Sequence, residues 1–538
     1  MRILVIGLDA ATMDLIEPWT AAGHLPALAS LIDEGSAGRF LSTPNMHSAS
    51  AWTSILTGLT PGRHGLFVFS DRDFATGRQV FFKGSDRSGE TIGSLLARHG
   101  LTAGFLNVPM TYKAECQPGG FMVSGLDAPS LNEHAFCPAE LRGELLGKFP
   151  DYRFTPPGLG DLMSAGRVED AISAWLKLTE TQTSAAEYLI ESRPTDFFMT
   201  VYTASDWGGH NLWSRKDHGS RHEPGKDLLS IYRALDQAVA RLLRHASDAT
   251  QVYVISDHGM GAHTGASYHL AEWLEANGYM KRDKLAQARG SLIGATRRAA
   301  KNLLPGSVKE KIKSGIGAQR IKQLQAGEKD SFYSSIDWAQ TMAYTEPGRH
   351  VININLAGRN AGGSVPATDY RVVCDRITRD LSDWTDASGT RVVERVVRRD
   401  EAYSGPFTRQ ASDLYVYWNP AARLGDPPDE VRARGFWWNG DHRPEGILIG
   451  KGPGIRRGLK VDGATVYDLV PTLMSGAKMP APAGLDGRAL REMFTDEFLE
   501  HNPLKIEASA QAAAADGSKL SEAEERLVKE KLRGLGYL

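Results

Sequence analysis

The chain carries three aspartates and three histidines at positions from which they could bind metal ions together. They are Asp9, Asp206, His210, Asp257, His258 and His442. Carboxylate oxygens and imidazole nitrogens suit Zn, Mn or Fe. Six such ligands suffice for two ions about 4 Å apart, the arrangement that serves in-line displacement at phosphorus. The residue types therefore predict a two-metal site for phosphoryl chemistry.

The local spacing supports this grouping, although each motif alone is a weak signal. Asp206 and His210 share one face if their segment is helical, since residues four apart are neighbours on a helix. Asp257 and His258 precede glycines, which permit close approach of the backbone to a cation. Alone, Asp9 would more often be a helix cap or a loop carboxylate. The joint occurrence of these motifs carries the prediction.

Ser48 is the candidate nucleophile. It lies a few residues before the apolar run 52–56, which begins a predicted helix. A hydroxyl near a helix N-terminus gains from the dipole and from free backbone N–H groups, which favour its alkoxide and a bound phosphoryl group. Position alone does not separate Ser48 from Ser50 or Thr53, and a plain serine cap is the alternative.

Three further residues are candidates for contact with substrate oxygens. Lys83 and Arg87 lie in the loop 82–87, and Asn107 comes at the end of a predicted strand. The alternative for these residues is an ordinary solvated loop.

Short apolar runs alternate with helical patterns along the chain. Strands are predicted at 3–8, 103–108, 197–202, 252–255, 351–356 and 446–450. Helices are predicted at 91–98, 138–148, 165–191, 227–245 and 270–277. This alternation favours an α/β fold with a mostly parallel sheet, whose ligands gather beyond the carboxyl ends of the strands. Asp9, Asp206 and Asp257 each fall at or shortly after a predicted strand end.

The 538-residue chain has a formal charge of -2, but the charge is unevenly distributed. Residues 281–323 contain 12 Lys/Arg and two acids, which gives +10 and leaves -12 for the remainder. We interpret 264–342 as a basic helical cap inserted into a catalytic core of 1–263 and 343–500, followed by a tail of 501–538. The cap is either a solvated lid or a surface that recruits anionic substrate or lipid headgroups. The near-neutral total argues against binding of duplex nucleic acid.

The three cysteines, Cys116, Cys137 and Cys374, form no C-x-x-C pair. We therefore expect neither a disulfide framework nor a cysteine-rich zinc site. The apolar run at the N-terminus ends at Asp9 and is too short for a signal peptide. These features predict a cytoplasmic protein, of a bacterium.

With these motifs in their order, the sequence resembles the alkaline phosphatase superfamily, in particular bacterial type I phosphodiesterase/nucleotide pyrophosphatase-like proteins. The shared order is Asp, a Ser/Thr nucleophile, Asp-x-x-x-His, Asp-His-Gly and His, over about 1–263 and 343–493. The resemblance implies a three-layer α/β sandwich with a mostly parallel central sheet. It also fixes Ser48 as the nucleophile, nine residues before Thr57, and implies a structural role for His64.

The resemblance further implies how the ligands are divided. Asp9, Ser48, Asp257 and His258 hold one ion, and three residues hold the other, namely Asp206, His210 and His442. Ser48 then attacks phosphorus in line with the leaving group, and water hydrolyses the resulting phosphoseryl intermediate. Zn is the expected metal, with Mn or Fe as alternatives.

Two departures from the family pattern bear on the substrate. Nucleotide pyrophosphatases carry an Asn about twenty residues after the nucleophile, where this chain has Phe69, and their nucleophile is more often Thr. The segment after Ser48 lacks the Pro and Arg of sulfatases. A phosphodiesterase is the main hypothesis, and a phosphomonoesterase or a phosphotransferase/phosphomutase is the alternative. A binding protein with a degenerate site is the non-enzyme reading.

Overall fold

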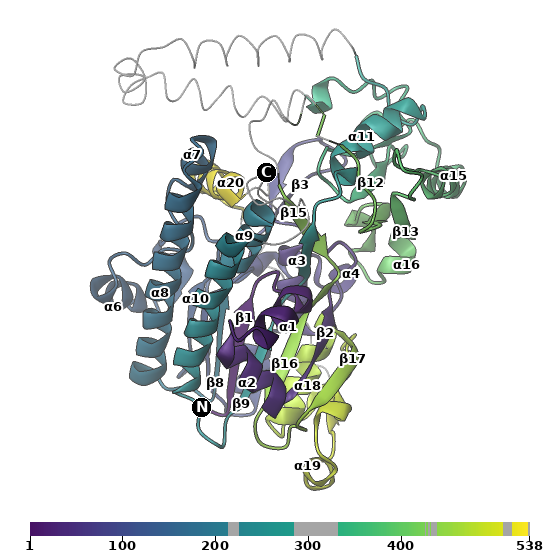
Figure 1. Ribbon diagram of the computed structural model, residues 1–538. Helices are drawn as coiled ribbons and strands as arrows, with labels where there is room; N and C mark the ends of the chain where they lie inside the picture. Colours follow the sequence, from purple (N-terminus) through teal and green to yellow (C-terminus); the bar gives the residue numbers. More distant parts are fainter. Residues whose placement is uncertain are drawn as a thin grey trace, which may run out of the picture.

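The structure, a computed structural model, describes residues 1–213, 225–283, 332–425, 427–428, 431, 438–508 and 519–535. Its centre is a nine-stranded sheet (Figure 1). In spatial order the strands are β17 (Leu459–Thr465), β2 (Ser36–Leu41), β16 (Glu445–Lys451), β9 (Gln251–Ile255), β1 (Ile3–Leu8), β8 (Phe197–Tyr202), β5 (Ala103–Val108), β6 (Phe121–Ser124) and β7 (Phe136–Cys137). All run parallel except β16 and β7. The predicted mostly parallel α/β sheet is confirmed.

Helices cover both faces of this sheet, so the fold has three layers (Figure 1). One face packs against α1 (Met13–Ala21), α2 (Pro26–Glu34), α6 (Leu141–Lys148), α7 (Leu159–Ser164), α8 (Val168–Ser192), α9 (Ala204–Leu212), α10 (Lys226–Leu243) and α20 (Glu522–Leu535). The other packs against α3 (Ser48–Thr57), α5 (Ile92–Arg98) and α18 (Leu469–Gly476). Strand β1 illustrates the sandwich, because Leu4 and Ile6 enter one core while Ile3 and Val5 enter the other. Burial on both faces explains its unbroken apolar run.

A second, four-stranded antiparallel sheet lies beside the sandwich (Figure 1). Its order is β11 (Ala343–Tyr344), β12 (Val351–Ile354), β14 (Leu414–Trp418) and β13 (Val393–Arg398). It shares a hydrophobic core with α11 (Ala266–Ala276) and α15 (Tyr370–Ser382), and α16 (Arg399–Ala402) follows β13. The strand predicted at 351–356 is present as β12, but it belongs to this antiparallel sheet and not to the mostly parallel one. An isolated apolar run does not reveal which sheet it joins.

The remaining elements are short. They are α4 (Pro61–His64), α19 (Asp496–His501), the pairs β3 (Ser70–Arg72) with β4 (Gln79–Phe81), β10 (Gly259–Ala262) with β15 (Gly440–Arg443), and β18 (Ala481–Pro482) with β19 (Ile506–Glu507). The sequence also missed β2 and β17, whose glycines and charged residues hide the strand pattern. Each still alternates buried and more exposed positions over part of its length.

The predicted boundaries at 264, 343 and 501 stay predictions. Residues 284–331, most of the basic segment, lie outside the described residues, as do 509–518 of the tail. The described end of the tail is α20, which places Val528 and Leu532 in the core of the main sandwich. Among the described helices, none has the length and apolar character that crossing a bilayer requires.

The structure corrects the expectation for the cysteines. Cys116 and Cys137 form a disulfide with a Cα–Cα distance of 5.7 Å, while Cys374 is free and buried. Cys137 lies on β7 opposite Met122 of β6, and this pairing brings it to the loop that precedes β6. The bond joins residues 21 positions apart, and only the fold brings them together.

Candidate active site

The three aspartates meet because their strands are neighbours. Asp9 follows β1, Asp257 follows β9, and Asp206 lies in the first turn of α9 shortly after β8. Strands β9, β1 and β8 are adjacent and parallel, so their carboxyl ends share one edge of the sheet. All three side chains are buried there, with 4% exposure or less.

One group of ligands forms around Asp206, as the sequence predicts. The segment that contains it is helical, and Asp206 Oδ1 lies 3.3 Å from the Nε2 atom of His210 one turn later. His442 on β15 brings its Nε2 to 3.3 Å from the same oxygen. One ligand atom of each of these three residues lies within 4.8 Å of the others, which is close enough to hold one ion.

A second group forms around the Nε2 atom of His258. Ser48 Oγ lies 3.0 Å from this nitrogen, Asp257 Oδ2 lies 3.2 Å from it, and Asp9 Oδ1 lies 3.8 Å from it. Of the four residues assigned to one ion by the resemblance, three thus lie around a single atom of the fourth. Ligand atoms of Asp9, Asp206 and His258 also lie within 4.8 Å of one another, so Asp206 stands between the two groups.

The histidine rings are held in the orientation that metal ligands need. The Nδ1 atoms of His210, His258 and His442 lie 3.0, 3.1 and 2.6 Å from the carbonyl oxygens of Gly440, Gly259 and Met46. A carbonyl oxygen only accepts, so each Nδ1 carries the proton and each neutral ring turns a bare Nε2 toward the cluster. The Nε2 atoms of His210 and His442 are 2.9 Å apart. Two lone pairs at that distance repel unless a proton or a metal ion lies between them.

The carboxylates also fit a bound cation. Burial, reinforced by Asp257 and Asp206, raises the pKa of Asp9 well above its ordinary value. Burial and Asp206 raise the pKa of Asp257 to about 7. Burial opposes ionisation of Asp206, but His210 and His442 in their protonated form outweigh it and hold its pKa well below the ordinary value. Asp9 Oδ1 and Asp257 Oδ2 are buried without a hydrogen-bond partner among the described residues. These oxygens are suitable ligands for a divalent ion.

Helix α3 presents Ser48 at the cluster. The helix begins at Ser48, four residues earlier than predicted, because His47 caps it by accepting a hydrogen bond from the N–H of Ala49 at 3.2 Å. All ten residues of the helix are buried, and Gly58 ends it with a φ of 69°, which favours glycine. Ser48 therefore stands at the positive end of a fixed helix dipole.

His64 lies in the core and not at the cluster. Its Nδ1 accepts a hydrogen bond from the N–H of Leu66 at 3.1 Å, so its Nε2 carries the proton and donates to Ser54 Oγ at 3.0 Å. The ring thus joins the loop after α4 to helix α3. These contacts are those expected of a structural histidine.

His64 is expected to make the protein acid-sensitive. Burial lowers its pKa to about 3, whereas the unfolded value is about 6.5. The stability it confers is complete above pH 6.5 and is lost as pH falls from there toward 3, by up to about 1.4 kcal/mol per unit. Urea unfolding of His64→Gln at pH 7, 5.5 and 4.5 should show a shallower pH slope than the wild type. The exposed His501 gives the control His501→Gln, and equal slopes in wild type and His64→Gln would contradict the assignment.

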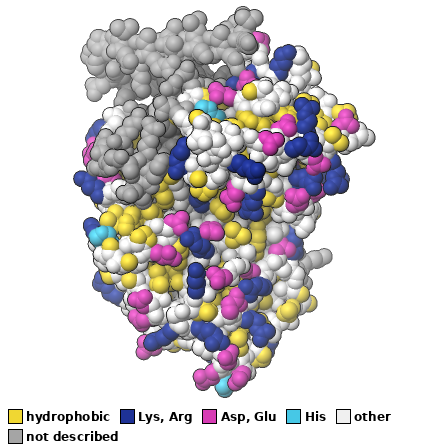
Figure 2. Space-filling model, turned by 45° about the vertical axis from the view of Figure 1, so that its right-hand side comes forward, with side chains coloured by type: hydrophobic (Ala, Val, Ile, Leu, Met, Phe, Trp, Pro, Cys, Tyr) yellow, Lys and Arg dark blue, Asp and Glu magenta, His cyan; other side chains and the backbone are white. Residues whose placement is uncertain are grey.

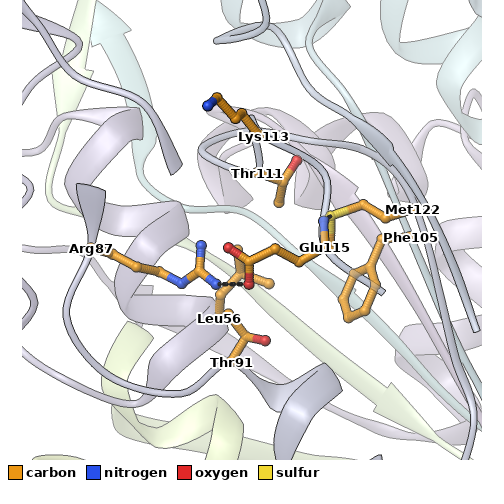
Figure 3. Close-up of a pocket in the computed structure, with 8 residues that line it drawn as sticks. All are labelled: Leu56, Arg87, Thr91, Phe105, Thr111, Lys113, Glu115 and Met122. Carbon is orange, nitrogen blue, oxygen red and sulfur yellow. Dashed lines mark hydrogen bonds and ion pairs between the residues drawn. The ribbon is translucent and has the colours of Figure 1, made fainter. Parts of the chain in front are cut away.

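The three substrate-binding candidates have neighbours of their own. Asn107 Oδ1 accepts a hydrogen bond from the hydroxyl of Tyr152, and Lys83 pairs with Asp86. Arg87 donates to Glu115 Oε2 at 2.8 Å inside a small pocket (Figure 3). The other residues lining that pocket are Leu56, Thr91, Phe105, Thr111, Lys113 and Met122, none of which belongs to the Asp/His cluster. A role in substrate contact stays a prediction for all three.

Four residues near the cluster carry no motif that singles them out in the sequence. Trp52 donates from Nε1 to Asp9 Oδ2 at 3.0 Å, and Asp441 binds two further histidines, His263 and His350. The sequence does contain one signal, because Asp441 and His442 repeat the adjacent Asp-His pair at 257–258. The contact with Trp52 has no comparable signal, since it depends on packing α3 across β1.

Two solved structures resemble this one in fold. The alkaline phosphatase PafA, solved as a multiple mutant, has 14% sequence identity and a TM-score of 0.53, over 92% of this chain and 98% of PafA. Phosphonoacetate hydrolase from Sinorhizobium meliloti 1021, in complex with phosphonoformate, has 15% identity and a TM-score of 0.50, over 87% of this chain and 94% of that one. No curated protein matches the sequence.

The family comparison covers most of the chain. Residues 3–440 match the family described as type I phosphodiesterase / nucleotide pyrophosphatase. The match includes five of the six predicted Asp and His ligands and Ser48, and ends two residues before His442. The protein therefore has an alkaline phosphatase-like fold and is a phosphoester hydrolase that belongs to the type I phosphodiesterase / nucleotide pyrophosphatase family.

Proposed function

We propose that the protein is a metal-dependent phosphodiesterase of the nucleotide pyrophosphatase type, with Ser48 as its nucleophile. The observation that carries this proposal is the convergence of three bare Nε2 atoms and three buried carboxylates next to the Ser48 hydroxyl. The alternatives are a phosphomonoesterase and a phosphotransferase or phosphomutase with the same site.

The proposed ligands are divided as the resemblance implies, with Asp9, Ser48, Asp257 and His258 at one position. The other position takes Asp206, His210 and His442. Nitrogen and oxygen donors in this proportion favour Zn, with Mn or Fe as alternatives. Bound ions would supply positive charge that lowers the pKa of the attacking hydroxyl and neutralises phosphate oxygens.

The protein's own residues prepare the attack on phosphorus. Ser48 Oγ–H donates to His258 Nε2 at 3.0 Å, so this hydroxyl is turned into the cluster. The N-terminus of α3 favours negative charge on Ser48 and on the phosphoryl group that it receives. Complete burial of Ser48 excludes bulk water and strengthens these interactions.

Initial rates on matched substrates test the reaction type. We expect the purified protein, reconstituted with Zn or Mn, to hydrolyse bis-p-nitrophenyl phosphate faster than p-nitrophenyl phosphate. A clear preference for the monoester would favour a phosphomonoesterase. A phosphorylated product formed with added alcohol would favour a transferase.

Trp52→Phe is expected to weaken metal binding about 10- to 100-fold, as loss of a group that orients a ligand does. The indole is completely buried, and its Nε1 donates to Asp9 at 3.0 Å. Titration of the metal-free protein with Zn would measure the change. Trp175→Phe is the matched control, because that buried indole N–H has no partner among the described residues. Equal weakening in both variants would assign the effect to ring size.

The basic segment is a further proposed determinant of the partner. On the described residues of the face that Figure 2 draws, basic and acidic side chains are interspersed. Such mixed charge does not favour duplex nucleic acid as the partner. We propose that 281–323 attracts a small anionic ester substrate or lipid headgroups. Replacing Arg297, Arg298 and Lys301, which lie outside the described residues, with alanine should raise KM for an anionic diester. Unchanged kinetics would contradict this role.

We also propose a cytoplasmic location. Disulfides such as Cys116–Cys137 are rare in the cytosol, so the redox state of this pair in cells is a test. Alkylation during lysis should trap both as free thiols. A bond recovered under those conditions would indicate an oxidising compartment.

A further inference from the structure

A two-stranded ribbon carries the last metal-ligand candidate. Strands β10 and β15 pair antiparallel, with Met260 opposite His442 and Gly261 opposite Asp441. Successive side chains of a strand point to opposite faces. His442 enters the Asp/His cluster, so its neighbour Asp441 turns to the other face of the ribbon.

Asp441 is the centre of a second buried network on that face. Its Oδ1 lies 2.9 Å from His350 Nε2 and accepts the backbone N–H of His442 at 3.0 Å, while its Oδ2 lies 3.5 Å from His263 Nε2. The Nδ1 of His263 accepts the N–H of Gly265 at 2.8 Å, so its Nε2 carries the proton. This ring is thus protonated on Nε2, the reverse of the three rings at the metal cluster, and this nitrogen lies 3.2 Å from Ser267 Oγ as well as 3.5 Å from Asp441 Oδ2.

The network joins the ribbon to the four-stranded sheet. His350 directly precedes β12, and its carbonyl oxygen accepts the N–H of Val416 on β14 at 2.8 Å. Its contact with Asp441 is therefore a direct polar bridge from this sheet to the strand that carries His442. Asp441 is only 2% exposed, so loss of the bridge would not be compensated by solvent.

The position of Asp441 in β15 affects two ligands at once. The residue before it, Gly440, supplies the carbonyl that fixes the ring of His210, and the residue after it is His442. Gly440 lies so close to helix α9 that an added Cβ would come within 2.2 Å of the Gly209 carbonyl oxygen. The strand thus has little freedom, and a shift at Asp441 would move both imidazoles.

We propose that Asp441, held by His350 and His263, is a positioning residue that sets the affinity of the metal position formed by Asp206, His210 and His442. It acts through the backbone on both sides of it and does not itself coordinate the ion. The inference rests on the proposed two-metal function. The residues of the other position, Asp9, Ser48, Asp257 and His258, lie outside β15, and Asp441 is not adjacent to any of them in the chain.

Zn titration of the metal-free protein tests the inference without using activity. We expect the wild type to bind two equivalents and Asp441→Asn to bind one of them about 10- to 100-fold more weakly, with a clearly smaller effect on the other. His350→Ala should weaken the same equivalent, and His350→Gln, which keeps an N–H donor, should restore much of it. Asp236→Asn is the matched control, because this buried carboxylate accepts the N–H groups of Ala27 and Leu28 instead.

The outcomes distinguish failure of the proposed two-metal function from failure of the positioning role of Asp441. A wild type that binds no metal would refute the proposed function itself. A wild type that binds two equivalents, with both affinities unchanged in Asp441→Asn or both weakened equally, would overturn the positioning role. If Asp441→Asn does not fold, His350→Ala and His350→Gln are compared instead. Equal Zn affinities in these two variants at both positions would then overturn the positioning role.

Discussion

Ser48→Ala is expected to lower turnover by at least about 10⁴-fold, as loss of a catalytic nucleophile does in other hydrolases. The Ser48 hydroxyl is the one that lies 3.0 Å from His258 Nε2 at the start of α3. The aspartate and imidazole ligands remain in the variant, so its metal content should stay close to that of the wild type. Steady-state rates on bis-p-nitrophenyl phosphate, together with elemental analysis of the same sample, measure both quantities.

Ser50→Ala provides the matched control in the same helix. The Ser50 hydroxyl is equally buried but bonds to Asn45 Oδ1 and to the carbonyl oxygen of His47, both at 2.8 Å. We expect its turnover per folded molecule to stay of the same order as the wild type. Near-normal activity in Ser48→Ala, or an equal loss in the two variants, would refute Ser48 as the nucleophile.

The second large effect is the stabilisation of the folded protein by bound metal, which we expect to increase as pH rises. Burial and Asp206 raise the pKa of Asp257 to about 7 in the metal-free protein. The Asp257 carboxyl group titrates near pH 3.9 in the unfolded chain, and its pKa is higher in the folded one. Its contribution to the free energy of unfolding is therefore complete below pH 3.9 and is lost as pH rises through 7. A bound ion replaces the proton, so the apparent affinity should fall about tenfold per pH unit below 7 for each proton displaced.

Thermal unfolding with Zn and with a chelator, at pH 5, 6, 7 and 8, measures this effect. We expect the difference in Tm between the two samples to increase with pH and to level off above pH 7. The increase should be smaller in Asp257→Asn, which removes the titrating carboxyl group. A difference that is independent of pH, or largest at pH 5, would contradict the raised pKa.

Much of the architecture could be predicted from the sequence because buried parallel strands have a distinct pattern. Residues 3–8, 103–108 and 197–202 were predicted with the bounds of β1, β5 and β8. Each is buried along its whole length and is therefore mostly apolar. The chain order of Asp and His after such strands was then enough to suggest a phosphoester hydrolase, and the family match supports that class.

The sequence could not show which strands become neighbours or which carboxyl group meets which imidazole. Antiparallel β16 separates β9 from β2, and β12 joins a different sheet, because pairing depends on contacts between distant segments. The same reason applies to the disulfide and to the Trp52–Asp9 contact.

The sequence by itself determined the ligand types and their positions at strand ends, since these depend on local burial and residue chemistry. Only the tertiary structure decided that helix α3 begins at Ser48, that three imidazoles turn bare nitrogens inward, and that Asp206 stands between two ligand groups. It also placed Asp441 behind the cluster. The rings of His210 and His442 are oriented by the carbonyl groups of Gly440 and Met46, which are far away in the chain, and residue spacing contains no record of those bonds.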